Sequence, residues 1–170
     1  VNKWKAASAE QRLKLLMQVR KNLRDDMKDL LDADCQMKKI KRGDKNTLHM
    51  EYGALQTLVV PMASNISVCI EFYELLIKGE MPQSINIERV GDGVYDARVF
   101  PKNAKDKVLY FDRKDILRIK GEPKQVNPLD KKGGIIAVLG AGNYNSAFEI
   151  IRALFIDNCV VAHKAHPINA

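Results

Sequence analysis

The hydrophobic positions in the first part of the chain follow a helical period. After Ser8, apolar residues recur every three or four positions with basic residues between them: Leu13, Leu16, Met17, Leu23, Met27, Leu30 and Leu31. This spacing predicts one long amphipathic helix with an apolar face and a solvated face. Ser8 and Gln11 have the form of a capping box, in which each side chain accepts a hydrogen bond from the backbone of the other, so the helix is expected to begin there.

Two further helices are predicted before residue 80. The basic segment 38–46 is expected to be a loop, and helical spacing resumes at about Leu48. Pro61 should kink or split this helix, because proline lacks an amide hydrogen and crowds the preceding turn. Another apolar helix is expected over 66–77, closed by Gly79 and Pro82. No apolar run approaches the ~20 residues that a membrane span needs, so no membrane partner is expected.

After Pro82 the pattern changes from helices to short strands. Runs of β-branched or aromatic residues, separated by turns rich in Gly, Asp and Asn, occur at 85–90, 94–100, 108–111 and 116–119. Such spacing is typical of antiparallel strands, and it includes a predicted hairpin around residues 103–106. Pro123 and Pro128 mark the connector that follows.

The last part of the chain has the pattern of a β-α-β unit. Ile135 to Leu139 form a continuous apolar run, typical of a parallel strand buried on both faces. A helical stripe over 147–155 and a second apolar run over 159–162 follow. We therefore expect an α/β protein with N-terminal helices (1–81), bridging antiparallel strands (82–122) and the start of a Rossmann-like parallel sheet (123–170), which is incomplete.

Charge and cysteine content exclude only a few classes of function. The chain has 28 Lys and Arg against 21 Asp and Glu, but its basic clusters lie apart and carry no nucleic-acid motif, so a solvated surface is the preferred interpretation. Nucleic acid and an anionic cofactor or substrate stay open. The three cysteines form no C-x-x-C pair, which favours a reducing compartment over a disulfide or zinc framework. His163 and His166 straddle a strand end, so no metal site is expected.

The turn after the first parallel strand is the first candidate site. It reads Gly140-Ala141-Gly142-Asn143-Tyr144-Asn145, in which two glycines fit G-x-G-x-x-G and Asn145 takes the third glycine position. No acidic residue follows the second strand to bind a ribose hydroxyl. Taken alone, the pattern favours a tight strand-to-helix turn over a dinucleotide site.

Read as a whole, residues 134–167 resemble the aldehyde dehydrogenase family. The order of Gly-Ile-Ile, an apolar strand, Gly-Asn-Tyr, a helix, Asp-Asn-Cys-Val-Val-Ala and Lys164 is similar to that family's G-V-V, P-W-N-[FY]-P, G-N-T-V-V and K-P-[SA]-E segments. The resemblance implies NAD(P)-dependent oxidation of an aldehyde by a full-length parent protein. It also implies that Asn143 donates a hydrogen bond to the developing oxyanion and that Lys164 contacts the adenosine part of NAD or NADP. Gly140, Ala141, Gly142 and His166 are expected to complete the cofactor site.

Each of these assignments has a simpler alternative, and the sequence departs from the family. Asn143 could be an ordinary turn residue, and Lys164 a solvated lysine. Ala141-Gly142 replace Pro-Trp, and Ala165-His166-Pro167 replace Pro-Ser-Glu. Loss of that glutamate removes a carboxylate that would repel a 2′-phosphate, so tolerance of NADP is a hypothesis.

The family's catalytic cysteine and general base belong to later segments, and the chain itself is expected to be inactive. Because it starts at Val1, we expect a piece of a longer protein, cytoplasmic in location with organellar targeting left open. Strands 82–122 resemble subunit-pairing elements, which implies a homo-oligomer. The alternatives are a non-catalytic nucleotide-binding module or pseudoenzyme, and a basic nucleic-acid interaction protein.

Overall fold

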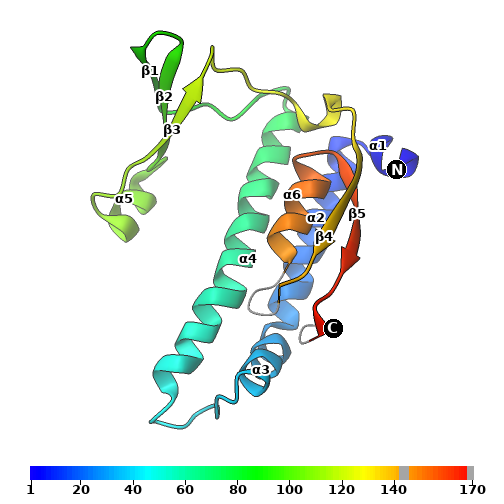
Figure 1. Ribbon diagram of the computed structural model, residues 1–170, viewed down its shortest axis with the longest axis vertical. Coiled ribbons are helices and arrows are strands. Elements are labelled where there is room, and N and C mark those ends of the chain that lie inside the picture. The colour runs from blue at the N-terminus through cyan, green and yellow to red at the C-terminus, as the bar shows by residue number, and fades with distance from the viewer. Residues whose placement is uncertain (142–145, 168–170) are drawn as a thin grey trace. The chain divides into compact units, whose positions relative to one another are not determined.

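The computed structural model describes residues 1–141 and 146–167, apart from the side chain of Leu109. It is a mixed α/β structure with helices, a small antiparallel sheet and a two-stranded parallel sheet (Figure 1). The chain divides into two compact units, which we call the helical unit (Val1–Glu80 with Asn127–Ala170) and the β unit (Met81–Val126). The N-terminal helices and the β-α-β unit thus belong to the same compact unit.

Three helices open the helical unit: α1 (Asn2–Lys5), α2 (Ala9–Asp25) and α3 (Met27–Met37). The predicted capping box is confirmed, because Gln11 N–H donates to Ser8 Oγ (3.3 Å) and Ser8 N–H donates to Gln11 Oε1 (2.9 Å). The predicted single long helix is wrong, since α2 ends at Asp25 and α3 starts anew at Met27. This break lets Leu31 and Cys35 pack with Ala54 in a second small core.

The next helix, α4 (Leu48–Ile77), runs unbroken through Pro61. The prediction of two helices separated at the proline is therefore wrong. Val59 and Ile66, on either side of Pro61, are buried in the same core as Leu16 and Leu23 of α2. Burial of this continuous stripe outweighs the one helix hydrogen bond that proline cannot make.

Helix α4 also corrects the expectation that no apolar run approaches the length of a membrane span. It has 30 residues and contains an 18-residue window with a mean hydropathy of 1.4, which is enough by length and composition alone. A core helix passes the same test, and 28% of its most apolar window is buried here. The finding is therefore weak support for a membrane span.

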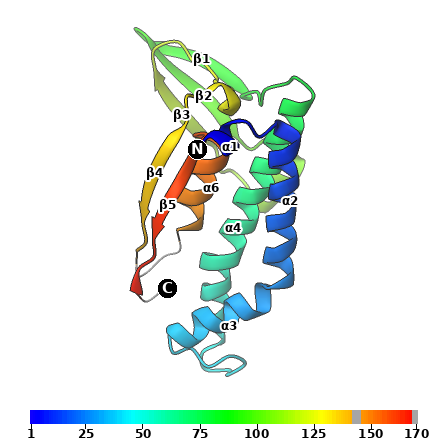
Figure 2. The same ribbon diagram turned by 90° about the vertical axis from the view of Figure 1, so that its right-hand side faces the viewer.

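The predicted β-α-β unit is confirmed. It consists of β4 (Gly134–Leu139), α6 (Ala147–Phe155) and β5 (Cys159–Lys164), preceded by a short 3₁₀ turn, η1 (Pro128–Asp130). The strands are parallel and in register from Gly134 opposite Cys159 to Leu139 opposite Lys164. Figure 2 shows α6 between these strands and the pair α2 and α4. Its Ile151 and Phe155 complete the main core with Leu16, Ile66 and Tyr73.

Strand β4 is covered on one face only. Ile136 is half-buried and Val138 is buried, whereas Ile135 and Leu139 on the opposite face are 67% and 75% exposed. The expectation of a strand buried on both faces is therefore wrong for the described residues. An apolar run predicts that a strand can be buried on both faces, but burial itself depends on which elements are present to cover it.

The β unit contains β1 (Asn86–Gly91), β2 (Val94–Phe100), α5 (Ala104–Tyr110) and β3 (Asp115–Lys120). The strands form an antiparallel sheet in the order β1-β2-β3, which confirms three of the four predicted strands. The strand predicted at 108–111 and the hairpin at 103–106 are wrong, because helix α5 occupies this segment. Asn103 caps α5 by accepting a hydrogen bond from Asp106 N–H (2.9 Å), a local signal stronger than the β-forming character of the residues that follow.

Candidate functional site

The carboxyl ends of β4 and β5 approach each other closely at Gly140. Gly140 N–H donates to the carbonyl oxygen of Lys164 (2.8 Å), one residue beyond the paired Leu139 and Lys164. A β-carbon on Gly140 would lie 2.8 Å from the backbone nitrogen of His166 and 3.2 Å from the carbonyl oxygen of Lys164. Both are backbone atoms and cannot rotate away, so only glycine fits without moving the strand ends apart.

A cavity of about 230 Å³ lies at this edge. It is lined by the last four residues of β4 (Ile136–Leu139) and by Ala141, Ser146 and Glu149. Ligands of open α/β sheets bind outside the carboxyl ends of the strands, where the dipole of the following helix favours an anion. Here Glu149 in the first turn of α6 opposes that effect with a negative charge. The cavity is large enough for one phosphate or ribose group, and its Glu149 carboxylate suits a ribose hydroxyl better than a phosphate.

Four of the predicted site residues meet at this edge. Gly140 and Ala141 follow β4, while Lys164 and His166 stand at the end of β5, the lysine exposed and the histidine half-buried. Gly142 and the predicted oxyanion donor Asn143 lie outside the described residues. The structure thus places part of the predicted site together and leaves the roles of its residues as predictions.

Two of the three thiols, those of Cys35 and Cys69, are buried and unreactive. Burial raises the pKa of Cys69 to about 11 and raises that of Cys35 as well, so both are protonated near neutral pH. Cys159 Sγ lies 3.2 Å from the carbonyl oxygen of Asp157 at the start of β5. Among residues 1–141 and 146–167, no three His, Cys, Asp or Glu side chains gather as a metal site.

A buried arginine forms a second polar cluster that sequence reasoning missed. The Arg12 side chain is 0% exposed. Its Nη2 donates to Asn158 Oδ1 (2.6 Å) and to the Trp4 carbonyl oxygen (2.8 Å), and its Nη1 donates to Tyr73 Oη (3.4 Å). Tyr73 in turn donates to the Phe155 carbonyl oxygen (2.8 Å). The guanidinium also lies 4.5 Å from the centre of the Trp4 ring.

This cluster fixes the beginning of β5, the end opposite the candidate ligand edge. Asn158 stands directly before β5 with φ of +55°, and its Nδ2 donates to the Lys131 carbonyl oxygen (2.8 Å). Trp4 Nε1 donates to the Leu154 carbonyl oxygen (3.0 Å), which binds α1 to α6. Burial raises the pKa of Tyr73, so its hydroxyl stays a donor. The residues join four helices to the strand, and their role is structural.

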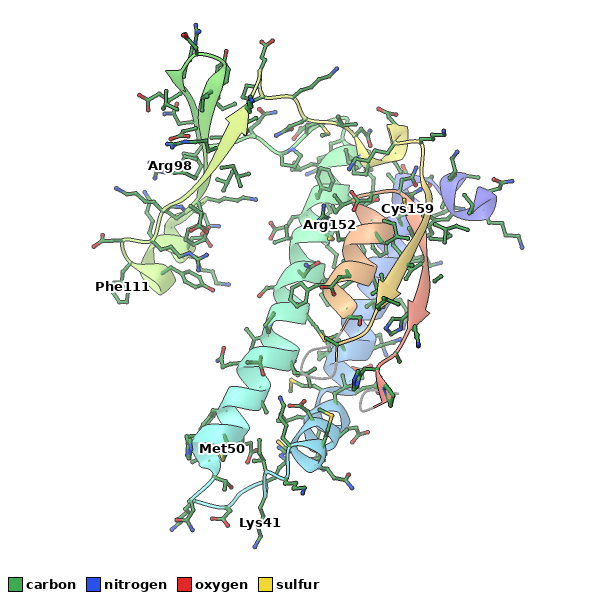
Figure 3. The ribbon with its side chains drawn as sticks, in the orientation of Figure 1. Lys41, Met50, Arg98, Phe111, Arg152 and Cys159 are labelled. Atoms are coloured by element: carbon green, nitrogen blue, oxygen red, sulfur yellow. The ribbon has the colours of Figure 1, made fainter. Side chains whose placement is uncertain are left out.

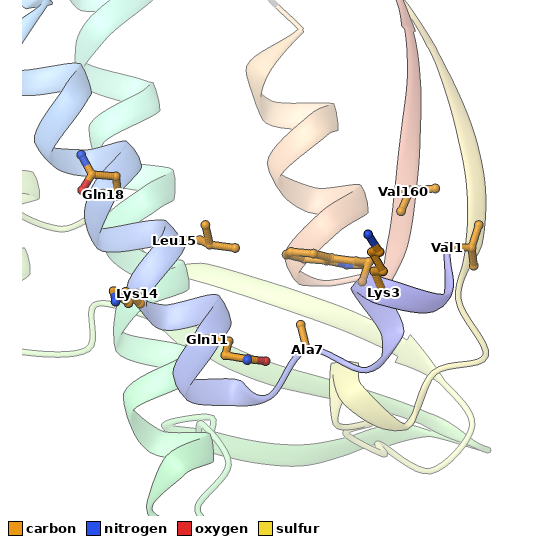
Figure 4. A pocket seen from close by; sticks show the side chains of 9 residues that line it. Val1, Lys3, Ala7, Gln11, Lys14, Leu15, Gln18 and Val160 are labelled. Atoms are coloured by element: carbon orange, nitrogen blue, oxygen red, sulfur yellow. The ribbon is translucent and has the colours of Figure 1, made fainter.

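A separate groove of about 710 Å³ lies between α1, α2 and β5 (Figure 4). Trp4, Leu15 and Val160 give it an apolar floor, and Lys3 and Lys14 stand at its rim. It is open, and it lies away from the carboxyl edge of the parallel strands. Its apolar lining offers no acid, base or nucleophile for a reaction.

Comparisons with protein-family models, curated proteins and solved structures find no match to this chain. The resemblance to aldehyde dehydrogenases therefore rests on the residues of the chain alone.

Proposed function

We propose that this chain is the N-terminal cofactor-binding part of an aldehyde dehydrogenase-like oxidoreductase that uses NAD or NADP. The observation that carries the proposal is the close approach at Gly140, where two parallel strands end beside a small cavity and the start of α6. A β-α-β unit whose strands end beside the start of a helix suits a nucleotide, because ligands of open α/β sheets bind outside the carboxyl ends of the strands. The order of the flanking motifs adds the family resemblance.

The described residues fit part of a cofactor site. Gly140 and Ala141 would border a phosphate or ribose, and the ammonium group of Lys164 would bind a hydroxyl or phosphate oxygen. His166, half-buried at the same edge, would border the adenosine side. The cofactor, when bound, supplies the acceptor for the electrons of the aldehyde. Asn143 is the proposed oxyanion donor, and a cysteine and a general base would come from another part of a longer protein.

The proposed partners are a small-molecule substrate and further copies of the chain. An aldehyde would be the substrate of the full-length protein, and the protein would form a homo-oligomer through its β unit. Opposed positions Ile87, Ala97 and Leu117 form an apolar face of that sheet, and Ile87 and Leu117 are 49% and 55% exposed. Exposed apolar faces of this kind are typical of surfaces that pair with another chain.

A non-catalytic nucleotide-binding module is the second candidate. Burial raises the pKa of Cys35 and Cys69, so neither thiol is a nucleophile near neutral pH and neither would supply the reactive cysteine of an aldehyde dehydrogenase. The two candidates share the nucleotide site and differ only in whether a longer protein carries the reactive cysteine. A basic nucleic-acid interaction protein, the third interpretation of the sequence, has only the excess of basic residues in its favour.

The nucleotide site predicts that the chain binds NAD and ADP-ribose and that Gly140→Ala weakens this binding about tenfold or more, since the new methyl group forces the strand ends apart. Lys164→Gln should weaken it about fivefold, the usual effect of losing one exposed charge-assisted contact. Isothermal titration calorimetry measures both dissociation constants.

Lys132→Gln is the matched control, because it removes the same charge from an exposed position just before β4, far from its carboxyl end. It should leave the dissociation constants unchanged. Equal weakening by Lys132→Gln and Lys164→Gln would show a general charge effect and would contradict the site. Absence of binding by the unaltered chain would contradict the proposed function itself.

The residues at the carboxyl ends of β4 and β5 also predict that the site tolerates NADP. Ala165-His166-Pro167 carry no carboxylate where the resembled family has one, so these three residues do not repel a 2′-phosphate, and Lys164 attracts it. NADP is expected to bind within about threefold of NAD, a difference below 1 kcal/mol. Parallel calorimetric titrations measure the ratio, and a strict preference for NAD would contradict the prediction.

A further inference from the structure

Helix α5 presents an unusual group of exposed apolar side chains. Val108, Tyr110 and Phe111 are 72%, 51% and 82% exposed, and all three lie within four consecutive residues. Figure 3 labels Phe111 directly after α5, the helix that joins β2 to β3. Single exposed apolar residues are common, but a group of three in one short segment marks a surface that contacts something else.

The segment is held firmly on the sheet by neighbouring side chains. The rings of Phe100 and Tyr110 pack edge to face with centroids 5.4 Å apart. The Arg113 guanidinium lies 5.6 Å and 5.9 Å from the centres of these rings, and both of its bonds to the Asp115 carboxylate are 2.9 Å long. Tyr110 therefore anchors α5, while Val108 and Phe111 remain free to contact a partner.

The backbone at Phe111 adds a second observation. Its φ is +48° and its ψ is −118°, a conformation that residues other than glycine rarely adopt. An aromatic residue in this region costs about 1–3 kcal/mol of backbone strain, and such strain is typical of functional positions. The turn ends α5 at Tyr110 and leaves the Phe111 ring exposed rather than buried.

Four lysines flank this apolar group in the sequence, against one exposed aspartate, Asp112, directly after Phe111. Lys102, Lys105, Lys107 and Lys114 are all exposed, and none forms an ion pair with a described residue. Lys105 stands three residues before Val108 within α5, so these two side chains are neighbours on the helix, and Lys107 lies in the last turn of the same helix, before Phe111. Asp106 is occupied by a hydrogen bond from Lys102 N–H (2.8 Å).

We propose that α5 and Phe111 form a docking element for an anionic lipid bilayer, in which Val108 and Phe111 enter the headgroup region and the lysines bind lipid phosphates or carboxylates. Exposed apolar side chains with lysines nearby in the sequence have the composition of interfacial membrane-binding segments. In such segments the lysine stems lie along apolar surface while their ammonium groups reach the headgroups.

The same residues fit other macromolecules less well. A single-stranded nucleic acid would need several ring faces for base stacking. The Tyr110 ring is already engaged by Phe100 and Arg113 and Val108 has no ring, so Phe111 alone of these three residues offers an exposed ring. A second copy of the chain would bring the same lysines together, and their repulsion would oppose pairing through this surface. Anionic lipid satisfies both the apolar and the basic groups.

Cosedimentation of the whole chain with vesicles tests the apolar contacts. The chain should bind vesicles of phosphatidylcholine and phosphatidylserine in equal parts and should not bind phosphatidylcholine alone. Phe111→Ser and Val108→Ser should each lower the partition coefficient about tenfold, since each removes an apolar side chain from the lipid interface. Val90→Ser is the matched control in the β unit, 46% exposed in β1, and should have no effect.

A second pair of variants tests the charges. The double variant Lys105→Gln/Lys107→Gln should lower vesicle binding by about fivefold for each lysine removed. The control double variant Lys120→Gln/Lys124→Gln removes the same charge elsewhere in the β unit and should change vesicle binding little. Equal binding to both vesicle types, or equal effects of the two pairs, would overturn the proposal. The proposal would also be overturned if the chain did not bind vesicles and Phe111 were instead required for binding a single-stranded oligonucleotide. The same holds if Phe111 were instead required for a dimer in sedimentation equilibrium.

Discussion

Replacement of Arg12 by methionine is expected to lower the free energy of unfolding of the helical unit by about 3 kcal/mol, the usual range for removing one partner from a buried polar cluster. Methionine fills much of the arginine volume but donates no hydrogen bond. Asn158 Oδ1 would then lose the Arg12 donor in a buried site, and the Trp4 carbonyl oxygen would be left with its hydrogen bond from Ala7 N–H. Urea unfolding followed by far-ultraviolet circular dichroism measures the change.

Arg20→Met is the control for this prediction. Arg20 lies on the same helix, but its side chain is exposed, so the change should stay within about 0.5 kcal/mol. Arg12→Lys should be nearly as harmful as Arg12→Met, because one ammonium group cannot reproduce the forked contacts to Trp4, Asn158 and Tyr73. If Arg12→Met and Arg20→Met had the same effect, the cluster would contribute nothing to stability.

Local signals in the sequence predicted the elements that local interactions decide. The capping box at Ser8 and Gln11 fixed the start of α2, and the apolar runs around Gly134 and Cys159 predicted the parallel strands. The break at Asp26 could not be predicted in this way, because Leu30 and Leu31 continue the helical period beyond it. Packing of α3 against Ala54 of α4 decides that break, and this contact joins residues far apart in the chain.

The same difference between local and distant contacts applies to the candidate site and the buried Arg12 cluster. Gly140 and Lys164 belong to a motif of about thirty residues, so the pattern of one short segment could predict that they meet. Arg12 and Asn158 are 146 residues apart, and no short pattern links them. One signal was available, since Arg12 lies on the buried stripe formed by Ala9, Leu16 and Leu23, where a charged residue needs buried partners.

Gly133→Ala is expected to destabilise the helical unit by about 3 kcal/mol or more, through backbone strain and a steric clash. Gly133 has a φ of +69°, and a β-carbon there would overlap the carbonyl oxygen of Asn158 and lie 3.4 Å from the Lys5 side chain. The lysine can move, but the Asn158 carbonyl is backbone at the start of β5. The same urea unfolding experiment measures the loss.

Gly79→Ala separates the two causes of this effect. Gly79 has a similar φ of +76°, but a β-carbon there meets no atom within 4 Å, so alanine adds only strain of about 1 kcal/mol. The difference between the two variants measures the close approach of residue 133 to Asn158, and equal effects would contradict that contact. Because Arg12 also acts through Asn158, Gly133→Ala combined with Arg12→Met should destabilise the helical unit by less than the sum of the single changes. Such non-additivity would identify the Asn158 turn as the shared point where the N-terminal helices hold β5.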